Sequence, residues 1–141
     1  MKAPMQKQGG VALLEVLIAI IILGIGLLGT IGLQARAYSA LSDAGQRAEA
    51  TIAADKLLGV MSNDVANLAK YQVAADADPS EELEPWMNET KGVIPTARVS
   101  VAVVQEDPLR SRVDIEISWK RKANEAENRH RVTSYINLPK L

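Results

Sequence analysis

One charged side chain stands alone in the most apolar part of the chain. Glu15 is the only charged residue between Val11 and Leu33, a run of 23 residues. An ionised carboxylate in apolar surroundings is heavily penalised unless a cation pairs with it. The run contains no cation, so the pattern predicts pairing with an ammonium from another chain or from a new N-terminus cut nearby. The alternative is a carboxylate that reaches the lipid headgroups and has no further role.

The composition excludes several other kinds of site. The 141 residues include no Cys and one His, so thiolate chemistry and a multi-histidine metal site are ruled out. No Ser-His-Asp set and no phosphate-binding loop is present, so we expect no enzyme activity, no cofactor and no small-molecule substrate. The net charge of -1 argues against a nucleic-acid partner. The single histidine, His130, is expected to be structural or exposed to solvent.

Four glycines lie in the second half of the apolar run. Three of them spell the dinucleotide fingerprint G-x-G-x-x-G, but that motif needs a preceding strand. Two other interpretations remain open: close approach of neighbouring helices, or a segment that bends or loosens on leaving the bilayer, since each Gly weakens a helix by about 1 kcal/mol. The alternative to both is the ordinary glycine content of membrane helices. The residues concerned are Gly24, Gly26, Gly29 and Gly32.

The apolar run is long enough to cross a membrane as one helix. About 20 residues at 1.5 Å each span a hydrocarbon core of about 30 Å. A cleavable secretory signal has a shorter apolar region of roughly 7–15 residues. Lys2 and Lys7 precede the run without any acid, so the positive-inside rule places the N-terminus in the cytoplasm. We therefore predict a single-pass segment over residues 11–35, with the rest of the chain outside the cytoplasm.

Residues 9–19, which read Gly-Gly-Val-Ala-Leu-Leu-Glu-Val-Leu-Ile-Ala, resemble the class III signal of type IV prepilins. The resemblance implies a leader over residues 1–10, cleavage after Gly10 by prepilin peptidase, and methylation of the new Val11 amine. Glu15 would then be the fifth mature residue and pair with the Val11 amine of a neighbouring subunit, which sets the assembly register. The family most often has Phe where this chain has Val11.

The resemblance also implies a location and partners. The chain would first lie in the bacterial inner membrane, with its globular part in the periplasm, and later in a pilus filament at the cell surface. Its partners would be prepilin peptidase, other major and minor pilins, and inner-membrane lipid. Residues 14–34 are similar to PilV-type minor pilins, which initiate or modify the filament.

Two alternatives to a minor pilin stay open. The GspI-type minor pseudopilin of type II secretion shares the sequence Leu-Leu-Glu-Val, found here at residues 13–16. An unrelated single-pass protein that displays a small binding domain is the other alternative. Such a protein would keep residues 1–10, whereas a pilin or pseudopilin would lose them.

Residues 36–70 are expected to continue the same helix in amphipathic form. Apolar residues recur at spacings of three and four, which indicates a helix with one buried face. Such a face needs a partner, and we expect a sheet to cover it. The positions are Tyr38, Leu41, Gly45, Ala48 and Ile52, then Leu58, Met61, Val65 and Leu68.

Residues 71–96 are expected to form an acidic connecting loop with a short helical turn at 80–83. Six acids precede Lys91 and two prolines interrupt the segment. The acid spacing does not follow the EF-hand pattern, so we predict no metal site. Trp86 and Met87 are expected to anchor the loop to the domain. In the alternative, Trp86 lies exposed and contacts another subunit.

Residues 97–141 alternate apolar and polar side chains, which predicts strands. Short turns at Asp107-Pro108 and at residues 123–128 imply an antiparallel sheet of three to four strands. We therefore expect an α+β fold of the type IV pilin kind, with a long N-terminal helix packed on this sheet. The core face would carry Val99, Val101, Val103, Val113, Ile115, Ile117 and Trp119, and the wet face Arg112, Asp114, Glu116 and Ser118.

A basic cluster lies at the second turn of this sheet. The simplest interpretation is a solvated hairpin tip. A sharper one is contact with the acidic loop of a neighbouring subunit. Binding of DNA is a weaker alternative, because the cluster lacks the aromatic platforms that bind single strands. The cluster consists of Lys120, Arg121 and Lys122, with Arg129 and Arg131 nearby.

Overall fold

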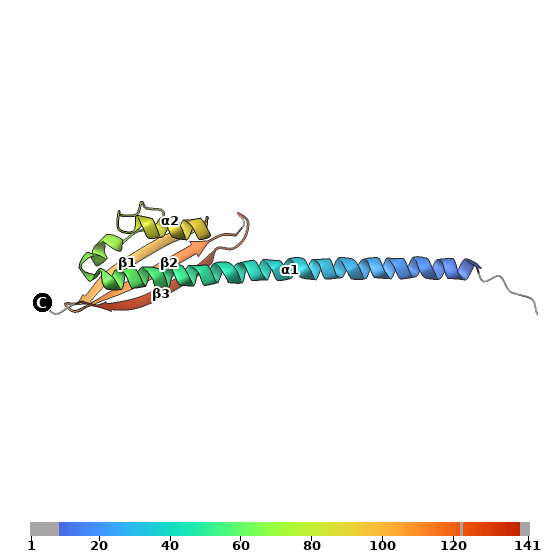
Figure 1. The fold of residues 1–141 in the computed structure, drawn as a ribbon, viewed down its shortest axis with the longest axis horizontal. Helices are drawn as coiled ribbons and strands as arrows, with labels where there is room; N and C mark the ends of the chain where they lie inside the picture. Colours follow the sequence, from blue (N-terminus) through green and yellow to red (C-terminus); the bar gives the residue numbers. More distant parts are fainter. Residues whose placement is uncertain (1–8, 122, 139–141) are drawn as a thin grey trace, which may run out of the picture. The chain divides into compact units, whose positions relative to one another are not determined.

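The computed structural model describes residues 9–121 and 123–138, and the chain divides within its first helix into two compact units, Met1–Ser42 and Asp43–Leu141. We call them the N-terminal unit and the globular unit. The fold is α+β, as expected from the sequence. The elements in chain order are α1 (Gly9–Asn63), the 3-10 helix η1 (Val65–Tyr71), α2 (Glu84–Val93), β1 (Arg98–Asp107), β2 (Arg110–Trp119) and β3 (Asn128–Asn137) (Figure 1).

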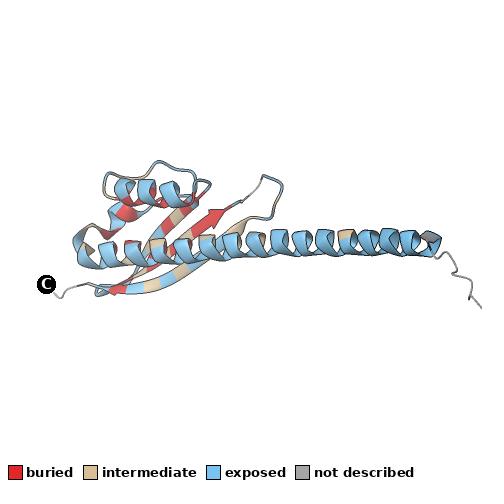
Figure 2. Cartoon of the chain, turned by 45° about the vertical axis from the view of Figure 1, so that its right-hand side comes forward, coloured by how far each residue is buried: buried red, intermediate tan, exposed pale blue. Residues whose placement is uncertain are grey.

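The N-terminal unit is helical in all of its described residues. Its apolar side chains are exposed, and α1 is long and apolar enough to cross a membrane (Figure 2). A helix that is apolar on all sides is stable only inside a membrane or among other helices. The helix predicted over residues 11–35 is therefore confirmed as a helix, and its composition is compatible with a single-pass anchor.

In the globular unit, α1 packs on the sheet through small residues. The buried positions Ala50, Ala54, Leu57 and Met61 follow one another at spacings of three and four. The predicted buried face is confirmed at Met61 but was wrong over residues 38–52, where Ile52 is 60% exposed. Alanine side chains let the helix backbone approach the sheet closely. A prediction that gives most weight to large apolar residues therefore places the buried face on the side of α1 that carries Ile52, which is exposed to solvent.

The helix α1 ends earlier than the sequence pattern predicted. It stops at Asn63 rather than near residue 70, and Asp64 leaves the helical conformation with φ −123° and ψ 53°. The Asp64 carboxylate accepts hydrogen bonds from Asn67 Nδ2 at 2.8 Å and from Tyr71 Oη at 2.9 Å. Short polar side chains of this kind offer the backbone an alternative to a further helical turn. The chain therefore continues as η1.

The segment predicted to be a connecting loop contains the ten-residue helix α2. Pro85 lies in its first turn, where the missing N–H costs nothing. The expectation of a loop was wrong over these ten residues, because a proline in the first turn marks the start of a helix rather than an interruption. Trp86, Met87 and Thr90 are buried, so one face of α2 closes the core of the globular unit. A polar turn precedes the helix, in which Ser80 Oγ donates to the Lys70 carbonyl at 2.5 Å.

The sheet has three antiparallel strands in the order β1-β2-β3, which confirms the predicted strands and both turns. Val101 lies opposite Ile115, and Ile115 lies opposite Val132. The core face is as predicted, with β2 most deeply buried (Figure 2). The prediction that Ser118 is exposed to solvent was wrong, because Ser118 is buried. Its hydroxyl donates to Glu127 Oε1 at 3.2 Å, so the β2–β3 loop covers it.

Candidate functional site

The residues predicted to be processed and to pair lie on the first turns of α1. Gly10, Val11 and Glu15 are all helical and exposed. Val11 and Glu15 are four residues apart, which places them on one face of the helix, with about 5–6 Å between Cβ atoms. No described residue forms an ion pair or hydrogen bond with Glu15. The structure therefore presents a carboxylate that lacks a cation within the described chain.

The surroundings of Glu15 are apolar on every side. Its neighbours along the helix include Leu14, Val16 and Ile18, which are exposed to the same degree as the rest of this segment. Whatever covers them, lipid or helices, removes water from the carboxylate as well. An ion pair is favoured in such a medium only when both partners are present.

The four glycines of the apolar run lie inside α1 without interrupting it. A Cβ atom added at any of the positions Gly24, Gly26, Gly29 or Gly32 would meet nothing within 4 Å. No backbone conformation or contact in the described part of the chain requires glycine there. The fingerprint G-x-G-x-x-G is fully helical and no strand precedes it among the described residues, so it is not a nucleotide loop.

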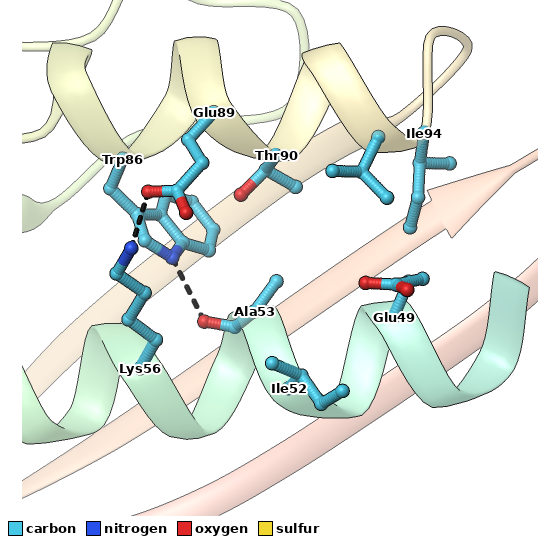
Figure 3. Close-up of a pocket in the computed structure, with 9 residues that line it drawn as sticks. Glu49, Ile52, Ala53, Lys56, Trp86, Glu89, Thr90 and Ile94 are labelled. Carbon is cyan, nitrogen blue, oxygen red and sulfur yellow. Dashed lines mark hydrogen bonds and ion pairs between the residues drawn. The ribbon is translucent and has the colours of Figure 1, made fainter.

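Trp86 anchors α2 to α1 and is not an exposed binding spot. Its side chain is 6% exposed, and its Nε1 donates to the Ala53 carbonyl at 2.8 Å (Figure 3). Beside it, Lys56 Nζ pairs with Glu89 Oε2 at 2.5 Å across the two helices. The anchor interpretation is confirmed. The alternative of an exposed subunit contact is wrong for Trp86, because the domain itself buries the indole.

Several arginines of the basic cluster form ion pairs with acidic residues of the same chain. Arg121 Nη2 pairs with Glu125 at 2.7 Å, its Nε lies 3.3 Å from Asp43 Oδ1, and the hydrogen bond to Glu125 raises the pKa of Arg121. Arg129 and Arg131 both pair with Glu116 on the outer face of the sheet. These pairs reduce the charge that the cluster offers to another molecule.

Of the two lysines in the cluster, the structure describes only Lys120. The side chain of Lys120 is exposed, and its carbonyl accepts a hydrogen bond from Thr96 Oγ1 at 2.8 Å. Lys122 lies outside the described residues. A contact between this cluster and an acidic segment of a neighbouring subunit therefore stays a prediction, and among the described lysines it would rest on Lys120.

Two acids of the segment at residues 71–96 form ion pairs with basic residues elsewhere in the chain. Asp76 binds Arg98, and this hydrogen bond lowers the pKa of Asp76. Glu82 binds Lys70 Nζ at 2.6 Å, which lowers the pKa of Glu82. Asp76 has a positive φ of 65°, a conformation that Asp tolerates better than most residues. Among the described residues no group of three acidic or histidine side chains could hold a metal ion.

Sequence reasoning missed one surface feature, a small apolar crevice between α1 and α2. Its lining includes the exposed Ile52 and Val93 and the buried Ile94. Ile52 and Glu49 of α1 lie on the side of the crevice opposite α2 (Figure 3). The signal that could have located it is the spacing of Trp86, Met87 and Thr90, which indicates a second amphipathic helix.

Comparison with known proteins gives one match. The prokaryotic N-terminal methylation motif covers residues 5–31, a span that includes Gly10, Val11, Glu15 and three of the glycines. No curated protein and no solved structure matches the chain. The motif indicates a type IV pilin or pseudopilin. It implies processing by prepilin peptidase and assembly with other pilins, and it suggests a structural subunit rather than an enzyme.

Proposed function

We propose that this chain is a minor pilin of the PilV type, which helps to initiate or modify a type IV pilus. Prepilin peptidase removes residues 1–10 and methylates the new amine of Val11. The chain is held in the bacterial inner membrane by residues 11–35, with its globular unit in the periplasm, until it enters the filament. Other major and minor pilins are its partners.

The observation that carries the proposal is the lone carboxylate of Glu15 within the methylation motif. The motif covers residues 5–31, and no described residue neutralises Glu15. Cleavage after Gly10 creates an ammonium one helical turn away, at Val11. A subunit that enters a filament can then exchange the lipid around its helix for neighbouring helices, and its carboxylate can meet the ammonium of the next subunit.

This pairing would act on register more than on net stability. Removing two charges from water costs several kcal/mol per ion, and their attraction returns about the same amount when the geometry is good. A subunit shifted along the filament axis would leave one charge unpaired, which is strongly unfavourable. The pair therefore selects one axial position among many that the featureless apolar surface would otherwise allow.

Mass spectrometry of the N-terminal peptide from sheared filaments tests the proposal directly. We expect a peptide that begins at Val11 and carries one methyl group, and we expect the uncut chain in cells without the peptidase. The same measurement on the membrane fraction shows how much of the chain is processed before assembly. Recovery of residues 1–10 on the chain from peptidase-containing cells would contradict the proposal.

A minor pseudopilin of type II secretion is the second candidate, because the sequence Leu-Leu-Glu-Val at residues 13–16 is shared with that class. It would be processed in the same way, so the N-terminal peptide does not separate the two. Deletion of the chain does. A minor pilin deletion reduces surface pili and leaves secretion intact, whereas a pseudopilin deletion blocks secretion and leaves pili intact.

A further inference from the structure

The two outer edges of the sheet differ in what lies beside them. Beside β1, Val73 forms a short bridge: its N–H donates to the Val101 carbonyl at 3.0 Å, and its carbonyl accepts from the Val101 N–H at 2.8 Å. Beside β3, no other described element runs alongside as β2 does (Figure 1). The outer edge of β3 is therefore open.

The strand register shows which backbone groups of β3 face this open edge. In an antiparallel sheet, the N–H and C=O of one residue point to the same side, and the side alternates from each residue to the next. Val101 bonds outward to Val73, so Ile115, which lies opposite Val101, bonds to the other side, to Val132 of β3. The N–H and C=O of Val132 therefore point to β2, and those of its two neighbours point away.

Odd-numbered residues of β3 thus face the open edge. The Leu138 N–H, which donates to the Leu109 carbonyl at 2.7 Å on the β2 side, follows the same alternation. The odd-numbered residues are exposed, and among the described residues no group outside the sheet bonds to their backbone. Each presents an unpaired N–H and an unpaired C=O in one row. These residues are Arg129, Arg131, Thr133 and Tyr135.

A row of unpaired backbone groups is a template for one more strand. Proteins bind extended segments at such edges, where main-chain hydrogen bonds supply the affinity and alternate side chains supply the specificity. Charged side chains on an edge strand limit what can pair with it. The side chains of β3 therefore decide which segment can be added.

Two arginines stand at the outer face of this edge. The side chains of Arg129 and Arg131 are 56% and 64% exposed, and β3 itself contains no acid. Both are held by the carboxylate of Glu116, one strand further in, and Arg129 also lies 3.6 Å from Glu127. A guanidinium has more N–H donors than one such contact uses, so each arginine can bind a further carboxylate.

These arginines specify the side chains of an added strand. Residues directly opposite one another across an antiparallel pair have Cβ atoms about 4.5–5.5 Å apart, whereas the acids of β2 lie one strand further away. Acids opposite Arg129 and Arg131 would therefore be favoured, and bases would be repelled. On the core side, a small apolar residue would cover Val132, which is only partly buried.

A second copy of this chain is a poor occupant for this edge. Parallel, in-register pairing of two β3 strands would place each arginine beside its counterpart, and like charges directly opposite are destabilising. Antiparallel pairing would turn one globular unit end for end relative to the other, an arrangement that does not suit two chains anchored by the same segment in one membrane. The edge therefore fits a segment of another protein better than it fits itself.

We propose that the open edge of β3 binds an extended segment of another protein, which adds a fourth, antiparallel strand with acidic residues opposite Arg129 and Arg131 and small apolar residues between them. The main chain of this segment bonds to the odd-numbered residues of β3. The inference goes beyond the proposed role in a pilus and does not depend on it, because the edge and its arginines belong to the globular unit.

A short synthetic peptide tests the edge on the full chain in detergent micelles. In the peptide Thr-Val-Thr-Val-Glu-Val-Glu, the two glutamates lie opposite Arg131 and Arg129 when it pairs antiparallel with β3. Hydrogen exchange of single backbone amides is followed by NMR. We expect fast exchange at Arg131 and Thr133 in the free chain and slow exchange at Val132. Saturating peptide should slow exchange at Arg131 and Thr133 at least about tenfold, because their N–H groups become paired.

Two methylated peptides are matched controls for the main-chain bonds. N-methylation of the third and fifth residues removes N–H groups that face β3, whereas N-methylation of the fourth and sixth removes N–H groups that face away from it. The first peptide should lose the protection of the edge amides, and the second should keep it. Equal protection by both would overturn the added strand.

The charge preference is tested with one altered peptide and two variants of the chain. A peptide with lysine in place of both glutamates should not protect the edge. Glu116→Gln frees Arg129 and Arg131 and should tighten binding of the acidic peptide about two- to fivefold, the usual worth of an exposed ion pair. Glu106→Gln removes the same charge beside Arg110 and should not tighten it. Equal binding of both peptides, or an equal effect of the two variants, would overturn the acidic segment.

The native chain alone distinguishes the possible occupants of the edge, so the test does not depend on how the variants fold. Protection of the edge amides that rises with the concentration of the chain, without any peptide, would place a second copy there and overturn the proposal. Failure of the acidic peptide to slow exchange at Arg131 and Thr133 would overturn it as well.

Discussion

At the scale of single residues, Glu15 offers the sharpest separation between anchoring and assembly. We predict that Glu15→Gln leaves the chain in the membrane, because removing a charge makes insertion easier. Incorporation into pili should fall at least about tenfold, since the variant leaves the ammonium of the neighbouring subunit unpaired in apolar surroundings, which costs about 3–5 kcal/mol, more than the 1.4 kcal/mol that a tenfold loss requires. Quantitative immunoblots of sheared pili and of membranes measure both effects.

The control for this experiment is Glu49→Gln, on the same helix. Glu49 is exposed and has no ion pair among the described residues, but it lies beyond the apolar run. It should be incorporated normally. If Glu15→Gln is also incorporated normally, the carboxylate does not set the register and the central argument for its role fails.

Trp86 allows the packing of its ring to be separated from its hydrogen bond. Trp86→Ala should destabilise the globular unit by about 3–5 kcal/mol, the usual loss for a buried tryptophan. Trp86→Phe retains much of the ring but loses the 2.8 Å bond to Ala53, and should lose clearly less. Denaturant unfolding followed by the fluorescence of Trp119 measures both. Equal losses would mean that the hydrogen bond, rather than the packing of the ring, anchors α2.

Asp76 should make the globular unit sensitive to acid. Arg98 lowers the pKa of Asp76 in the folded state, so the pair stabilises the fold above the ordinary Asp value of about 4. That stabilisation is lost as the pH falls through the lower folded value. Asp76→Asn removes the charge and keeps a residue that tolerates the positive φ. Its stability should therefore fall less than that of the native chain between pH 7 and pH 3.

Asp78→Asn is the matched control, because Asp78 lies just after the turn that contains Asp76, is exposed, and has no ion pair among the described residues. Unfolding midpoints of the native chain and both variants at pH 7 and pH 3 decide the matter. A loss of acid sensitivity in the Asp78 variant equal to that in the Asp76 variant would show that Arg98 is not the cause.

At the scale of elements, the face that α1 turns to the sheet can be tested with one pair of substitutions. Ala54→Leu should destabilise the globular unit by about 1–3 kcal/mol, because the added atoms overpack a fully buried position. Ala48→Leu, which makes the same chemical change on the exposed side, should alter stability by less than about 0.5 kcal/mol. The reverse ranking would place the sheet-facing side where the sequence pattern put it.

This helix also shows how far the sequence could be read. Its existence followed from spacings of three and four, and so did the burial of Met61, but the buried side over residues 38–52 did not, because alanine gives little contrast between a core position and an exposed one. The strands could be predicted because Val113, Ile115 and Ile117 alternate with charged residues. That alternation also identifies which face of the sheet is buried. The helix α2 was missed because Pro85 marks a helix start as readily as an interruption.

The candidate functional residues likewise fall into those that the sequence could predict and those that it could not. Glu15 could be located from the sequence because a single charge in 23 residues is a strong signal. The ion pairs of the basic cluster could not be predicted, since Arg121 and Asp43 are 78 positions apart in the sequence and only the fold brings them together. Trp86 could be expected to anchor its segment, but the carbonyl that receives its N–H belongs to a helix 33 residues away.

At the scale of the whole molecule, the division of the chain within α1 predicts that its two units can be altered separately. Every buried residue of the described core lies at or beyond Ala50, so the core of the globular unit contains nothing from residues 9–42. Replacing Gly24, Gly26, Gly29 and Gly32 together by alanine should leave the denaturant midpoint of the globular unit unchanged. Fluorescence of the two tryptophans, both in that unit, reports it.

The same fourfold variant decides what the glycines do. The added methyl groups meet nothing in the chain and strengthen the helix by roughly 1 kcal/mol at each position. If the segment must bend or be approached closely by another helix during assembly, the variant should insert into the membrane but appear in sheared pili at a fraction of the native level. Native levels in pili would assign these glycines to the ordinary composition of membrane helices, because neither bending nor close approach could then be required.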